Sequence, residues 1–190
     1  MLVYEMNGRP LEPQHGYPLR LIVPGWYGMT SVKWLESIEA VSEPFNGYQM
    51  MATYRYAQTS DDPGEPVDLM RVRALMLPPG IPDFLTRTRL LDAGLVTLTG
   101  RAWAGRLGIA RVETSSDGGA TWSDAQLGVQ PPQFAWHAWT AKWNATPGRY
   151  TLMVRATDTQ GNCQPVRPEW NIQGMGNNMV QTVDVVVEAG

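Results

Sequence analysis

The stretch "RYTLMVRATD", Arg149–Asp158, decides the fold. Its larger apolar side chains alternate with polar ones, which places one set on a single face of an extended strand: Tyr150, Leu152, Val154 and Ala156. The later stretch "VQTVDVVVE" repeats this pattern with Val183, Val185 and Val187. Both patterns predict strands that bury one face in an apolar core and expose the other.

Working outward, residues 67–190 contain further strand-like segments, among them "VDLMRVRALML", "LVTLTGRAWAG" and "IARVETSS". Turn residues separate these segments about every ten positions, as in antiparallel sandwiches. We therefore predict a mostly β chain with an immunoglobulin-like antiparallel β-sandwich at 67–190. The likeness is architectural, because Cys163 is the only cysteine and no intersheet disulfide is possible.

Composition excludes several classes of function. Formal charge is −3, from 15 basic and 18 acidic residues, and no basic cluster occurs, so nucleic acid is not an expected partner. His15 and His137 are too far apart for a zinc motif. No apolar run approaches the roughly 20 residues of a membrane-spanning helix.

The rest of the chain divides into two segments. Residues 1–41 form a loop-rich segment, in which "RLIV" predicts a buried strand. The segment "SVKWLESIEAV" predicts one helical turn at Ser31–Leu35 and a strand at Glu36–Val41. Residues 42–66 form a connection that ends in an acidic loop rich in proline and glycine.

A cationic turn lies within the first segment. His15-Gly16, Arg20 and the run Thr30–Lys33 bring two fixed cations and an imidazole beside a glycine-bracketed turn. Lysine gives phosphate a point charge and arginine gives it a planar fork, so the group suits a phosphorylated cofactor tail. An ordinary proline-glycine turn with solvated charges explains the same residues, and spacing alone does not separate the two.

The segment "SSDGGATW", Ser115–Trp122, fits the Asp-box pattern of sialidase-like propellers. Asp117 is expected to bind turn backbone, the glycines to permit positive φ, and Trp122 to pack under the hairpin. A propeller needs one copy per blade, and the chain has one copy. We therefore interpret the motif as a hairpin stabiliser without chemistry of its own.

Two further segments have both a structural and a functional interpretation. In "FAWHAWTAKW", alternation places Phe134 and Trp136 on one face and His137, Trp139 and Trp143 on the other. Core or interface packing is favoured over a stacking platform for sugars or bases. The stretch "DTQGNCQPVRPEWNIQGMGNN" predicts a long ordered loop, in which the lone cysteine is interpreted as an incidental thiol rather than a nucleophile or metal ligand.

Taken in order, these motifs resemble the sulfite oxidase family of molybdopterin oxidoreductases. "MNGRPLEPQHGYPLRLIVPGWYGMTSVKWL" resembles the end of its molybdenum-cofactor domain. "GRAWAG…IARVETSSDGGATW", "FAWHAWTAKW" and "EWNIQGMGNN" resemble its immunoglobulin-like dimerisation domain. The resemblance covers essentially all 190 residues in the family's order. It implies three parts: a cofactor-domain remnant at 1–41, a connection at 42–66 and a dimerisation domain at 67–190.

The resemblance also implies roles for particular residues. The molybdopterin contacts of the family correspond to His15, Arg20, Ser31 and Lys33, with Val32 contributing backbone. An anion-binding arginine of the second domain corresponds to Arg106, although the local loop length differs. Many sulfite-oxidising members carry an arginine where this chain has Met29-Thr30, which argues against a standard sulfite site.

The family's cysteine ligand to molybdenum lies upstream of these motifs. We therefore expect the chain to be the last part of a molybdenum-molybdopterin oxidoreductase, inactive alone and completed by an upstream cofactor domain. The resemblance further implies a homodimer through the β-sandwich and a small oxyanion substrate, and leaves the electron acceptor and compartment open. Family members occur in the bacterial periplasm, the mitochondrial intermembrane space and peroxisomes. The alternative is a non-enzymatic dimerisation or interaction module.

Overall fold

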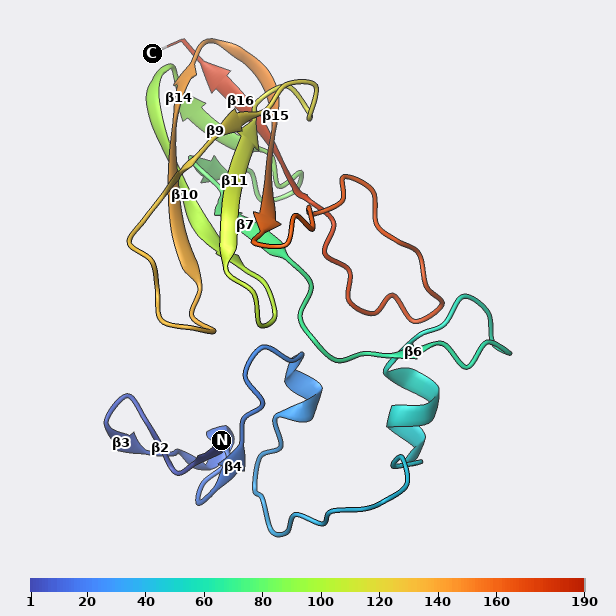
Figure 1. The fold of residues 1–190 in the computed structure, drawn as a ribbon. Helices are drawn as coiled ribbons and strands as arrows, with labels where there is room; N and C mark the ends of the chain where they lie inside the picture. Colours follow the sequence, from blue (N-terminus) through green and yellow to red (C-terminus); the bar gives the residue numbers. More distant parts are fainter. Residues whose placement is uncertain (190) are drawn as a thin grey trace. The chain divides into compact units, whose positions relative to one another are not determined.

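The computed structural model describes residues 1–189, which form two compact units. The first unit comprises Met1–Met70 together with Trp170–Gly176, and the second comprises Arg71–Glu169 and the chain from Asn177 onward. Figure 1 shows that most of the ordered sheet lies in the second unit. Over residues 1–189, no helix has the length and apolar character needed to cross a bilayer.

The second unit is a sandwich of two sheets (Figure 1), which confirms the predicted mostly β fold. The four-stranded sheet has the order β13 (Gln126–Leu127), β14 (His137–Ala145), β10 (Gly94–Trp103), β7 (Arg73–Leu77). The six-stranded sheet has the order β12 (Ser123–Asp124), β11 (Ile109–Ser115), β15 (Gly148–Asp158), β16 (Gln181–Glu188), β9 (Arg89–Asp92), β8 (Ile81–Pro82). Pairing is antiparallel except between β16 and β9, which run parallel.

The alternating residues of β15 and β16 fill the space between the sheets, as predicted. Leu152 and Val154 are fully buried against the valines of β16 and against Leu98 of β10. Trp139 is 1% exposed and belongs to this core, so core packing is confirmed for that tryptophan. Trp136 lies before β14, is mostly exposed and stacks on Trp103 with ring centroids 4.8 Å apart.

The first unit is built from short pieces. Three two-stranded pairs form it: β1 (Leu2–Val3) with β4 (Arg20–Leu21), β2 (Glu5–Met6) with β3 (Arg9–Pro10), and β5 (Arg55–Tyr56) with β6 (Glu65–Pro66). Three short helical turns lie between these strands in the sequence. Turn η1 (Pro13–His15) lies between β3 and β4, and η2 (Gly28–Thr30) and η3 (Gln49–Thr53) lie between β4 and β5.

Three local predictions in this unit are wrong. "RLIV" contributes only the two half-buried residues of β4, the helical turn lies at Gly28–Thr30, and Glu36–Val41 is exposed and forms no strand. The reason is a main-chain pairing that the pattern did not show. Leu21 donates to the carbonyl of Val32 over 2.8 Å, and Leu35 donates to that of Leu19 over 2.8 Å. Residues 32–35 therefore lie beside β4 without forming a regular strand, since Trp34 has a φ of 53°.

The predicted long loop joins β15 to β16, and residues 159–180 contain no strand. Part of this loop belongs to the first unit. Ile172 donates its N–H to the carbonyl of Ala57 over 2.9 Å, and an added Cβ at Gly176 would overlap the Tyr56 ring. The first unit is therefore assembled from two segments that are distant in sequence.

Candidate functional site

A left-handed glycine organises the cationic turn of the first unit. Turn η1 ends at Gly16, whose φ is 104°, a conformation that side chains disfavour. A Cβ at Gly16 would lie 3.0 Å from the Cβ of Lys33. The glycine thus lets the main chain after His15 pack directly on Lys33.

Arg20 and Lys33 are both tied to this turn. Arg20 Nη1 donates to the carbonyl of His15 over 3.0 Å, and Lys33 Nζ donates to the carbonyl of Gln14 over 2.9 Å. Trp34 Nε1 donates to the carbonyl of Pro13 over 2.9 Å, and the Lys33 ammonium lies 5.1 Å from the Trp34 ring centroid. The role of Trp34 was not predicted, and its place next to the lysine is the only sequence signal for it.

Ser31 and Val32 lie in the segment beside β4 that carries Lys33. The Ser31 hydroxyl accepts a long, 3.4 Å hydrogen bond from the N–H of Val23, and the carbonyl of Val32 accepts from Leu21. The Val32 side chain is exposed, which agrees with a backbone role. The structure therefore gathers all five residues predicted in this unit around one turn and its partner segment.

The cations retain donors for an anion. One guanidinium N–H of Arg20 is used by the His15 carbonyl, while its Nε is buried and has no partner among residues 1–189. Lys33 has three ammonium donors, of which Gln14 accepts one. Lys33 is exposed, so its remaining ammonium donors are available to a phosphate or pterin oxygen. The residues present fit an anionic cofactor.

Arg106 belongs to the second unit. It follows β10 in the loop that leads to β11, and its side chain is exposed. Within the described chain it has no hydrogen bond or ion pair. Its proposed contact with an anion stays a prediction.

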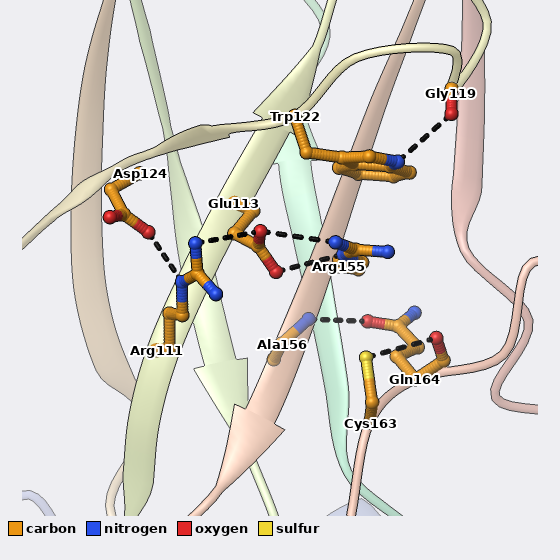
Figure 2. A network of polar contacts seen from close by, with 9 residues as sticks. All are labelled: Arg111, Glu113, Gly119, Trp122, Asp124, Arg155, Ala156, Cys163 and Gln164. Carbon is orange, nitrogen blue, oxygen red and sulfur yellow. Dashed lines mark hydrogen bonds and ion pairs between the residues drawn. The ribbon is translucent and has the colours of Figure 1, made fainter.

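The second unit contains a charged network on the outer face of its six-stranded sheet (Figure 2). The Glu113 carboxylate is 6% exposed and accepts from Arg155 Nε and Nη2 over 2.8 and 3.0 Å. Arg111 Nη2 lies 3.0 Å from the same carboxylate, and its Nε donates to Asp124 over 2.5 Å. The Arg155 guanidinium lies 4.1 Å from the Trp122 ring centroid, so the carboxylate is enclosed on several sides.

The Asp-box motif stabilises a turn, as predicted, and its Trp122 also contacts Arg155 of the network. Asp117 accepts from the N–H and hydroxyl of Thr121 over 2.9 and 2.6 Å, and these bonds hold the pKa of its carboxyl well below the usual value. Gly118 and Gly119 have φ values of 70° and 91°. Trp122 Nε1 donates to the carbonyl of Gly119 over 3.0 Å (Figure 2). Every group of the motif is used in holding the turn.

Cys163 lies near this network and is exposed. Its thiol is 3.7 Å from the carbonyl oxygen of Gln164 (Figure 2). Across residues 1–189, no three His, Cys, Asp or Glu side chains gather as a metal site would require. The interpretation as an incidental thiol stays a prediction.

Comparison with known proteins places these features in a family. The model described as "Oxidoreductase molybdopterin binding domain" matches residues 1–49, and that described as "Mo-co oxidoreductase dimerisation domain" matches residues 69–188. The chain belongs to the sulfite oxidase family of molybdopterin oxidoreductases. It spans the end of the molybdopterin-binding region and the dimerisation domain, in the predicted order.

Individual relatives agree with this assignment. Mitochondrial sulfite oxidase of Homo sapiens is 35% identical over 98% of this chain and 36% of its own length. A nitrate reductase of Hordeum vulgare is 30% identical over 94% of this chain and 22% of its own length. The crystal structure of the sulfane dehydrogenase SoxCD from Paracoccus pantotrophus covers all of this chain with a TM-score of 0.84, at 25% identity and 51% of its own length. The chain thus spans about a third of the length of these mitochondrial sulfite oxidases.

Proposed function

We propose that this chain forms one side of a molybdopterin site and the homodimer contact of a molybdenum-dependent oxidoreductase. One observation carries the proposal: the cationic residues gather around Gly16 within the segment that matches a molybdopterin-binding family. The curated relatives are named as sulfite oxidases and nitrate reductases, which supports a small oxyanion as the substrate.

Each residue has a defined part in this proposal. Arg20 and Lys33 bind the anionic oxygens of the cofactor with donors that the turn does not use. His15 lies on the turn, Ser31 lies in the segment that carries Lys33, and Val32 offers main-chain groups. Molybdenum, when bound through its pterin, supplies the two-electron redox chemistry, while this chain binds and orients the group.

The proposal is tested by titrating the 190-residue chain with molybdopterin and following pterin fluorescence. We expect saturable binding that K33A and R20A each weaken at least tenfold, because each removes a charged donor. Arg9→Ala, an exposed cation on β3 of the same unit, is the matched control and should bind as the wild type does. Absence of binding, or equal losses in all three variants, would contradict the proposed site.

A further inference from the structure

The hairpin β8–β9 is an exposed apolar feature of the second unit that the cofactor proposal leaves unused. Its residues Ile81, Phe84 and Leu85 are 74%, 80% and 86% exposed. Ile81 is paired with Leu90 on β9, and Leu90 is paired with Val186 on β16, so an apolar row crosses three neighbouring strands. Apolar patches of this kind mark interaction sites on soluble proteins.

The hairpin is held rigidly despite this exposure. Asp83 accepts from the N–H and hydroxyl of Thr86 over 2.8 and 2.6 Å, which closes the turn behind Phe84 and Leu85. Arg89 donates to the carbonyls of three residues before β8 over 2.6 to 3.0 Å: Pro78, Pro79 and Gly80. A preorganised element loses little conformational entropy when it binds, so the tip is suited to a stable contact.

A recess of about 360 Å³ adjoins the hairpin. Its lining combines the apolar side chains of Pro78, Pro82 and Val183 with the charged side chains of Arg87, Arg89 and Asp184. A two-fold symmetric contact between identical copies is isologous, so one surface must offer both the protruding group and the site that receives it. The hairpin tip and this recess meet that requirement within one protomer.

We infer that the β8–β9 hairpin is a contact between two copies of this chain. In this contact, Phe84 and Leu85 of each copy pack on the hairpin and recess of the other. The occupant is a second copy because the hairpin lies within residues 69–188, which match a dimerisation domain. Buried aromatic and aliphatic side chains carry most of the binding energy in such contacts. The inference rests on the proposed homodimer and specifies its surface.

Sedimentation velocity of the 190-residue chain over a range of concentrations tests the inference. We expect a wild-type dimer and at least tenfold weaker association in F84S/L85S and in L85K. Val129→Ser is the control, since Val129 is 94% exposed in another loop of the same unit. It should dimerise as the wild type does. Thermal unfolding of each variant should show an intact fold, because the substituted side chains are exposed.

The outcomes separate the two proposals. Wild-type association in both hairpin variants, with the dimer intact, would overturn the hairpin contact and leave the homodimer standing. A wild-type chain that stays monomeric at every concentration would overturn both the hairpin contact and the homodimer. Neither result affects the molybdopterin titration, which depends on residues of the first unit.

Discussion

Glu113 shows how one buried charge decides the local stability of the sandwich. Its carboxylate is 6% exposed and is bridged by two arginines, of which Arg155 is itself largely covered by Trp122. We expect Glu113→Ala to lower the free energy of unfolding by about 2 kcal/mol, because Arg155, whose side chain is 25% exposed, would lose two charge-assisted hydrogen bonds. Urea denaturation measures this loss.

The second arginine provides the matched control. The Arg111 side chain is 54% exposed, so its ion pairs are screened by solvent. Arg111→Ala should therefore change the urea midpoint little. Equal losses in Glu113→Ala and Arg111→Ala would show that the network is not organised around the buried carboxylate.

Strand β10 depends on a glycine at its centre. A Cβ at Gly100 would collide with the carbonyl oxygen of Leu75 on β7 and with the ring of Trp139 on β14. Both neighbours are parts of the packed sheet and have no free space to move. We expect Gly100→Ala to destabilise the second unit by about 3 kcal/mol, measured as a fall in the urea midpoint.

Gly108 is the comparison position for this strand. It lies in the loop after β10, and an added Cβ there would make ordinary contact with Thr159 at 3.4 Å. Gly108→Ala should leave the midpoint nearly unchanged. A similar midpoint for both variants would mean that β10 adapts to the extra methyl group.

At the scale of the element, prediction from sequence succeeded where one face of a strand meets a core. The periodicity of β15 and β16 was sufficient, because the predicted core side chains from Leu152 to Ala156 and from Val183 to Val187 are buried, although Met153 on the other face of β15 is buried as well. It failed at Glu36–Val41, where apolar residues are exposed and no neighbouring strand exists. The parallel pairing of β9 with β16 was not predicted either, because pairing between distant strands leaves no local pattern.

At the scale of the whole molecule, the candidate site was predicted through the order of motifs rather than through their chemistry. The spacing of His15, Arg20 and Lys33 alone favoured an ordinary turn. The contact between Gly16 and Lys33 joins segments 17 residues apart, and the carbonyl partners of the cations are set by main-chain geometry. Neither leaves a signal in residue types.

The membership of Trp170–Gly176 in the first unit leads to a prediction about the whole chain. Asn171 is 6% exposed and holds this loop by accepting from the N–H of Met175 over 2.8 Å and donating to its carbonyl over 2.9 Å. We expect Asn171→Ala to destabilise the loop by about 2 kcal/mol. Hydrogen exchange should then accelerate in residues 54–58 and 170–176.

The internal control for this experiment is the second unit of the same variant. Exchange in β10 and β14 should match the wild type, although Asn171 is closer in sequence to β15 than to β5. Faster exchange confined to β15 and β16 would contradict the assignment of this loop to the first unit.

The position of β16 has a consequence for synthesis on the ribosome. This strand lies between β15 and β9 inside the six-stranded sheet, yet it is translated after both of them. While residues 181–188 remain in the exit tunnel, the nascent chain presents the open edges of β15 and β9 and leaves uncovered the core residues that pack on the valines of β16. Open edges of this kind favour aggregation, so the growing polypeptide should be a chaperone client until its last strand is inserted.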